Sequence, residues 1–317
     1  MKNLDYKRSG FKSDNIPSYG NGGSRMLNYS FKPEPTFIEK KGVPATCFFG
    51  IELEYECKND DYEEDFNLFE FVEGIYRYND FEKLFYTKKD STFYGPEFVF
   101  QPISFLGIVE LYRQGFWHKF FEMKEKFYKS TSKTGLHVHI DKDMGFIEDS
   151  KGKKMNQNME KIAYSLYQFN SKYHNMFKSL TKRKSFGYCI PKKTIEHDSH
   201  DSAINETKVT YEMRFWASPV NVERLMYCLS VVEAIDIVSK SNKHTTVPEI
   251  LKAIFYSIPM KIRDTFKVEI LFPKEMSDFL KILESKNFLS NRIQKTIGFT
   301  DNRSNSTVSL LEEESYD

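Results

Sequence analysis

Three segments of the chain alternate apolar and polar residues with a period of two. They are residues 47–57 (CFFGIELEYEC), 135–141 (GLHVHID) and 209–217 (VTYEMRFWA). Because successive side chains of a strand point to opposite faces of a sheet, each segment predicts a strand with one buried and one polar face. Strands buried in a parallel sheet are continuously apolar instead. The pattern therefore favours an antiparallel sheet that carries polar groups on one face.

Longer segments between these strands have apolar residues at helical spacing. We expect helices over 65–86, 104–129, 155–180 and 220–239, more helical sequence to about 294, and a short extended piece at 97–101. The combination predicts an α+β fold, in which long helices flank the antiparallel sheet and the active site lies on one sheet face.

The ends of the chain differ in composition from its middle. Residues 1–45 contain clusters of Gly, Pro, Ser and Asn, which favour turns and predict a loose N-terminal arm. We expect a main domain over 46–240, a helical part over 241–300 packed on it, and a flexible tail over 301–317. The polar segment 191–208 has no apolar repeat and predicts a loop that closes over a site as a lid.

Charge and hydropathy exclude several classes of partner. The 317 residues include 46 Lys and Arg against 45 Asp and Glu, so the net charge of +1 gives no general attraction to nucleic acid or to an anionic membrane. No stretch approaches the ~20 apolar residues of a membrane span, and no apolar signal region follows the charged start. We expect a cytoplasmic protein. The four cysteines lack a CxxC pair and are expected to be reduced and structural.

Carboxylates form the first candidate site. Glu52 and Glu54, with Glu56 beyond them, project from one face of the first strand and repel one another unless cations lie between them. Magnesium or manganese suits such a row, although a solvated strand face is the common alternative. Glu97 follows the Gly95-Pro96 turn at the start of an extended piece and is weak evidence alone.

Two histidines and a second acid extend this pattern. His137 and His139 share one strand face and predict either a metal pair or a hydrogen-bonded structural pair. Glu212 and Arg214 share another strand face, where they bind metal and a phosphoryl group or form a plain salt bridge. Arg183 lies in a basic cluster that is typical of a solvated helix end. No Walker A, GxGxxG, GxSxG or HExxH motif is present.

The order GIELE, DSTFYGPEF, GLHVHI, RKSFGYC and YEMRF resembles the amidoligase family, relatives of glutamine synthetase and glutamate-cysteine ligase. The resemblance covers residues 48–235 and implies a glutamine synthetase-like catalytic sheet. It implies metal ligands at Glu52, Glu54, Glu97, His137 and Glu212, nucleotide contacts at His137, Arg214 and Glu97, substrate contacts at His139 and Arg183, and catalytic roles for Arg214, Glu54 and Arg183. Asp90 lies near another acid of the family, but its shorter side chain makes it a poor match.

The same resemblance implies an ATP-dependent ligase that uses Mg²⁺ or Mn²⁺. A small-molecule or peptide carboxylate would be phosphorylated to an acyl phosphate, which an amine then attacks to form an amide or isopeptide bond. The alternatives are a metal-dependent phosphate or amide hydrolase and an inactive structural or binding protein of a mobile element. Nothing in the sequence specifies an oligomeric state.

Overall fold

The structure is a computed structural model of the 317-residue chain. It describes residues 3–8, 35–45, 47–58, 71, 84–89, 92–142, 147–148, 154–155, 157–187, 189–199, 201–241, 243–285 and 288. Most of the helix predicted over 65–86, and the predicted tail, lie outside the described residues. At the end of that predicted helix, residues 85 and 86 belong to a strand instead.

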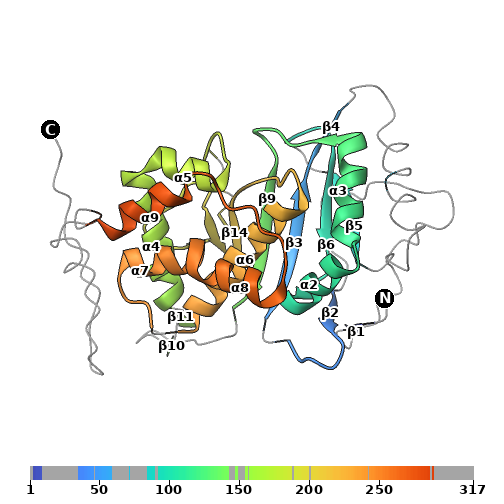
Figure 1. The fold of residues 1–317 in the computed structure, drawn as a ribbon, viewed down its shortest axis with the longest axis horizontal. Helices are drawn as coiled ribbons and strands as arrows, with labels where there is room; N and C mark the ends of the chain where they lie inside the picture. The colour runs from blue at the N-terminus through green and yellow to red at the C-terminus, as the bar shows by residue number, and fades with distance from the viewer. Residues whose placement is uncertain are drawn as a thin grey trace.

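A mixed but mostly antiparallel sheet of ten described strands forms the centre of the molecule (Figure 1). Its order is β1-β2-β7-β3-β9-β14-β13-β12, and β6 joins the end of β3 and carries β5 on its other side. The strands are β1 (Leu4–Arg8), β2 (Thr36–Lys40), β3 (Phe48–Glu54), β5 (Phe85–Lys89), β6 (Pro96–Phe100), β7 (Ile103–Ser104), β9 (Gly135–Asp141), β12 (Glu196–His197), β13 (Ile204–Glu206) and β14 (Thr210–Ala217). Only the β2–β7 and β12–β13 pairs are parallel among these.

Two further sheets have two short strands each. They pair β4 (Glu56–Cys57) with β8 (Tyr128–Lys129), and β10 (Ile147–Glu148) with β11 (Lys154–Met155). The three strands predicted from alternating polarity are therefore present as β3, β9 and β14, and they are adjacent in the sheet.

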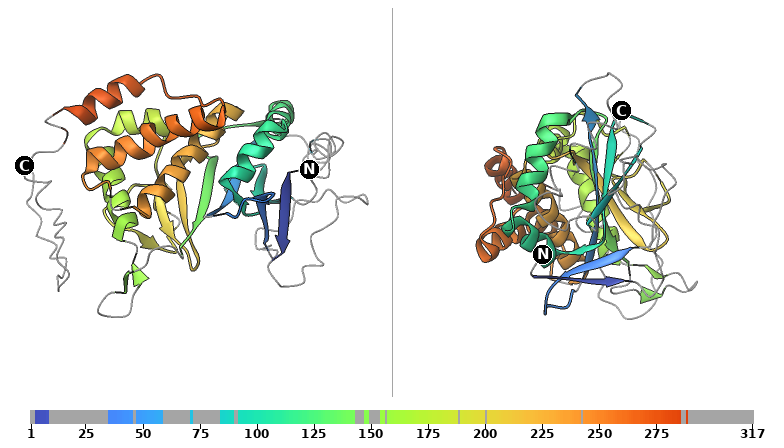
Figure 2. Two further views of the ribbon diagram at one scale, coloured as in Figure 1. Left: turned by 60° about the horizontal axis from the view of Figure 1, so that its bottom comes forward. Right: turned by 90° about the vertical axis from the view of Figure 1, so that its right-hand side faces the viewer.

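The helices gather on one face of the sheet (Figure 2). They are α2 (Phe105–Arg113), α3 (Phe116–Phe127), α4 (Gln157–Lys172), α5 (His174–Thr181), α6 (Val222–Ser239), α7 (Val247–Lys252), η2 (Ala253–Ser257), α8 (Ile258–Phe266) and α9 (Met276–Glu284). The most buried, α6, is apolar on nearly all sides, which is typical of a helix covered by other elements. The opposite sheet face is left for polar side chains.

Two helices predicted as single are each broken in two. The predicted helix 104–129 ends at Arg113 and begins again at Phe116, because Gly115 adopts a left-handed conformation (φ 76°) that ends the first helix. The predicted helix 155–180 breaks at Tyr173, whose ψ of 46° is not helical. In both places the apolar spacing continues across the break, so the pattern did not reveal it.

Two predicted loops contribute strands. Within the predicted loose arm, β1 and β2 pair with each other, and β2 continues the sheet through β7. Within the predicted lid at 191–208, β12 and β13 form the opposite edge of the sheet. This segment is therefore tied to the sheet backbone along two short stretches, which corrects the prediction of a loop without regular structure.

Aromatic side chains fill the space between α3 and the strands β5 and β6. Phe98 lies 5.3 Å from Phe120 and 5.9 Å from Phe85, measured between ring centroids, and Phe120 lies 5.2 Å from Phe71. Edge-to-face and tilted contacts of this kind add to the stabilisation from buried area. The packing holds β6, which carries Glu97, against the helix layer.

The four cysteines of the chain lie in its interior. Cys47, Cys57, Cys189 and Cys228 are free and buried. No helix in the described part of the chain has the length and apolar composition needed to cross a membrane.

We predict that Gly95→Ala strongly destabilises the protein. An added Cβ would lie 2.1 Å from the carbonyl oxygen of Tyr55 and 3.0 Å from Cα of Glu56, so backbone must move. We expect a loss of at least ~2 kcal/mol in the free energy of unfolding, measured by chemical denaturation. Gly187→Ala is the control, because the nearest atom is 3.8 Å away, and an equal loss in both variants would contradict the prediction.

We also predict that stability falls as the pH rises from about 4.5 to 7. Burial raises the pKa of Glu233 on α6 to about 7, with Asp236 acting in the same direction and Lys240 opposing it. The folded state therefore holds a proton that the unfolded chain releases at lower pH, which removes at most ~3 kcal/mol of stability across this window. Denaturation curves should show a flatter pH dependence in Glu233→Gln, and an unchanged slope would contradict this assignment.

Candidate metal and phosphate site

Strands β3, β9 and β14 bring polar side chains together on the sheet face opposite the helices. Glu52 lies opposite His137, while His139 lies between Gly50 and Glu212. Directly opposed residues of antiparallel strands share a face, so these side chains form one group. Leu53 and Leu136, on the other face, are fully buried. Four of the predicted site residues thus meet on three neighbouring strands.

Strand β6 extends the same face on the other side of β3. Glu97 lies opposite Glu54, and Lys88 of β5 lies opposite Glu97. The Nζ atom of Lys88 is 3.2 Å from Oε1 of Glu97, and both residues are buried. The predicted acid Glu97 therefore joins the group, while Asp90 lies outside the described residues. Lys88 is an additional member that the sequence analysis did not select.

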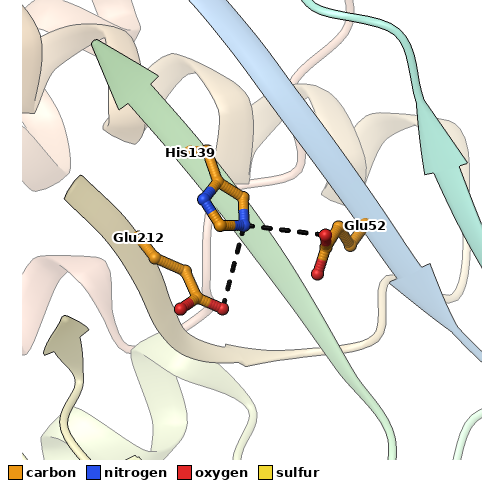
Figure 3. A group of neighbouring side chains, drawn as sticks. All are labelled: Glu52, His139 and Glu212. Carbon is orange, nitrogen blue, oxygen red and sulfur yellow. Dashed lines mark ion pairs between the residues drawn. The ribbon is translucent and has the colours of Figure 1, made fainter. Parts of the chain in front are cut away.

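His139 points between two carboxylates (Figure 3). Its Nε2 atom is 3.7 Å from Oε1 of Glu52 and 3.9 Å from Oε1 of Glu212. This nitrogen is buried and has no hydrogen-bond partner among the described residues, whereas Nδ1 lies 3.1 Å from Oγ1 of Thr210. One ligand atom from each of Glu52, His139 and Glu212 lies within 4.8 Å of the other two. The spacing exceeds hydrogen-bond length and suits a shared cation.

His137 occupies the middle of the carboxylate row. Its Nδ1 atom is 3.6 Å from Oε2 of Glu52 and 3.6 Å from Oε1 of Glu212, and its Nε2 atom is 3.6 Å from Oε1 of Glu54. The sequence analysis expected a metal contact from His137 and a substrate contact from His139. The structure places both rings among the acids, with His139 in the group of three ligand atoms. The division of roles between them stays a prediction.

Glu212 is held by neighbours on both oxygens. Nη1 of Arg214 lies 2.6 Å from Oε1, and the side-chain amide of Asn205 on β13 donates to Oε2 at 3.0 Å. The carbonyl oxygen of the same amide accepts from the backbone N–H of Ser199 at 2.8 Å. Asn205 lies in the segment expected to be a loop, where no alternating pattern marked it. Its position opposite Glu212 becomes visible only through the pairing of β13 with β14.

Arg183 contacts backbone in this structure. It donates through Nη1 to the carbonyl oxygen of Thr134 at 3.2 Å and through Nη2 to that of Arg214 at 3.1 Å. Gly135 makes room for it, since a Cβ there would lie 2.2 Å from Nη2. The N–H of Gly135 in turn donates to Oε2 of Glu54 at 2.6 Å. The predicted substrate residue thus also joins β9 to β14 directly beside the site.

The electrostatics of the group follow from burial opposed by close charges. Burial favours the protonated form of Glu52, but contacts with His137 and His139 outweigh it and hold the pKa of Glu52 well below its usual range. Burial and the neighbouring Glu52 charge raise the pKa of Glu97, while the Lys88 ammonium acts in the opposite direction. His139 has a raised pKa because Glu52 and Glu212 outweigh its burial. The acids on this small surface therefore differ in how readily they bind a proton.

The donor atoms are compatible with a divalent cation. Glu52 and Glu212 provide carboxylate oxygens, and His139 provides an unpartnered imidazole nitrogen. Oxygen-rich sets suit Mg²⁺ and Mn²⁺, and the added nitrogen is acceptable to Mn²⁺ and Zn²⁺. The side chains of Glu52 and His139 are 19% and 22% exposed, so solvent reaches this part of the group while Glu54 and Glu97 are more deeply buried.

Comparisons with known proteins give little further information. No protein-family model matches the chain, and no curated protein matches its sequence. A crystal structure described as a novel glutamine synthase homolog is similar with a TM-score of 0.38 and 9% identity, over 81% of this chain and 68% of that chain. Similarity of this degree does not define the family or the activity of the chain.

We predict that Arg183→Met destabilises the fold even without ligands. The change removes two partly buried hydrogen bonds to backbone carbonyl groups, which corresponds to ~1–3 kcal/mol in the free energy of unfolding. Chemical denaturation measures this loss, and Lys184→Met, at an exposed neighbouring position, is the control. Equal stability of Arg183→Met and Lys184→Met would contradict this structural role.

Proposed function

We propose that this chain is an ATP- and Mg²⁺-dependent carboxylate-amine ligase with a catalytic sheet related to that of glutamine synthetase. The observation that carries the proposal is the meeting of the four strand motifs on one sheet face. The strands that bear them, β6, β3, β9 and β14, are consecutive neighbours, although 34 residues lie between Phe100 and Gly135 and 68 lie between Asp141 and Thr210 along the chain. A structural salt bridge needs two residues, whereas this face collects four carboxylates, two imidazoles and a guanidinium.

In this proposal Glu52, His139 and Glu212 hold a divalent cation. When bound, the cation would polarise phosphate oxygens and offset the charge of the nucleotide. Glu54 and His137 lie next to these ligands and keep them oriented through the contacts between imidazole and carboxylate. The described geometry supports this assignment because Nε2 of His139 is buried and otherwise unpartnered among the described residues.

Arg214 is the side chain best placed to meet a transferring phosphoryl group. Its Nη1 atom pairs with Glu212, while Nε is buried and has no partner among the described residues. Burial opposes its charge, but Glu212 and Glu54 outweigh that effect and raise the pKa of Arg214 above its already high value. The guanidinium therefore stays charged at any working pH and offers N–H donors in a planar fork.

The proposed reaction has two steps. An oxygen of the substrate carboxylate attacks the γ-phosphorus of ATP, and the bond from that phosphorus to the β,γ-bridging oxygen breaks, which releases ADP and leaves an acyl phosphate. The nitrogen of an amine then attacks the acyl carbon. The bond from this carbon to the phosphate oxygen breaks, inorganic phosphate leaves, and the amine proton passes to solvent, so that one amide bond forms per ATP.

We predict that ADP formation from ATP and Mg²⁺ requires Glu52 and rises when a carboxylate and an amine are supplied together. Glu52→Gln should lower the rate at least ~100-fold, because it removes the charge of one metal ligand while keeping its size. A coupled ADP assay with pools of amino acids and amines measures the rate. Glu125→Gln is the matched control, since Glu125 lies on α3 with a side chain 70% exposed and pairs with Lys58.

Other outcomes of this assay would overturn the proposal. Phosphate release from ATP or phosphate esters that needs no amine, or metal-dependent cleavage of amides without ATP, would indicate a metal-dependent hydrolase. Absence of nucleotide binding together with intact folding would indicate a binding or structural role. Equal activity of Glu52→Gln and Glu125→Gln would place the chemistry elsewhere on the molecule.

A further inference from the structure

The buried ion pair between Lys88 and Glu97 lies at one end of the carboxylate row. The two side chains are 10% and 4% exposed, and their charged atoms are 3.2 Å apart. Lys88, Glu97 and Glu54 are successive partners across β5, β6 and β3, so their side chains share the site face. The ammonium also acts on Glu52, whose pKa it helps to lower. Lys88 is thus part of the electrostatics of the whole group.

Two basic side chains lie at the two sides of the row. Arg214 pairs with Glu212 on β14, and Lys88 pairs with Glu97 on β6. Between these two side chains lie Glu52, His139 and Glu212. Among the described residues, their ligand atoms are close enough to one another to hold a metal ion. Glu54 and Glu97 are outside that group. Instead, Glu54 accepts a hydrogen bond from the Gly135 N–H, and Glu97 faces the lysine.

We infer that the Lys88 ammonium takes the place of a second divalent cation beside Glu54 and Glu97. In the absence of nucleotide the chain then binds one divalent cation, at Glu52, His139 and Glu212, and this inference rests on the metal site of the proposed function. A positive charge fixed 3.2 Å from Glu97 repels a divalent ion from the same carboxylate and occupies one of its oxygens. Lys88 is accordingly a specificity-determining residue that sets how many metal ions the free site accepts.

The test measures Mn²⁺ binding to the purified full chain without nucleotide, by the electron paramagnetic resonance signal of free Mn²⁺ and by calorimetry. The wild type should bind one Mn²⁺ ion, and Glu52→Gln should weaken that site at least ~10-fold. Lys88→Met should acquire a second site, or tighten a weak second site at least ~10-fold, because the repelling charge is gone. Lys88→Arg keeps the charge and should bind one ion like the wild type.

Controls separate the local effect from net charge and from misfolding. Lys58→Met removes the same charge from an ion pair of the same 3.2 Å length, but at the surface beside Glu125, and should leave the stoichiometry at one. Circular dichroism and thermal denaturation check that each variant is folded. If Lys88→Met does not fold, Lys88→Gln provides the same neutralisation while keeping a hydrogen-bond donor for Glu97.

The outcomes are distinguishable. One Mn²⁺ ion in both the wild type and a folded neutral variant of Lys88, with equal affinity, would overturn the inference and leave the proposed function intact. Two ions in the wild type would also overturn it, since the ammonium would then not exclude the second. A wild type that binds no Mn²⁺ would overturn the metal site of the proposed function and, with it, the role of Lys88.

Discussion

Repulsion among carboxylates on one sheet face is the constraint that the site must satisfy. Glu54, Glu97 and Glu212 are buried, and Glu52 lies among them. Unpaired buried charges of one sign are strongly unfavourable, so each acid needs a cation, a hydrogen-bond donor or a proton. The structure gives Glu212 an arginine and an amide, Glu54 a backbone N–H, and Glu97 a lysine. The His137 ring lies 3.6 Å from an oxygen of each of Glu52, Glu54 and Glu212.

The scaffold supplies the rigidity that such a group requires. The apolar side chains that alternate with the site residues, such as Ile51, Leu53 and Val138, are fully buried in one continuous core. The hydroxyl of Tyr55 donates to the carbonyl oxygen of Pro219 at 2.8 Å, and Ser218 donates to the carbonyl oxygen of Glu54 at 2.6 Å. These two hydrogen bonds join the end of β3 to the segment after β14. They help to fix Glu54 relative to Arg214.

Period-two alternation allowed the strands β3, β9 and β14 and their site residues to be predicted from sequence, because each has a fully apolar and a polar side. Lys88 was not predicted as a site residue, because the apolar and aromatic residues before it, at 65–86, indicated a helix and not the strand β5. Asn205 was not predicted as a site residue either. Its strand, β13, is three residues long, which is too short to show an alternating pattern of its own. Gly115 shows the same limit, since periodicity carries no information on a single left-handed residue within a helical stretch.

The side-chain amide of Asn205 has a mechanical consequence. Its two ends hold the backbone of Ser199 and the carboxylate of Glu212, and the amide plane between them does not bend. The backbone position of Ser199 and the orientation of the Glu212 carboxylate are therefore linked through one side chain. Residues 196–199 at the edge of the sheet are thereby connected to one side chain of the candidate metal group.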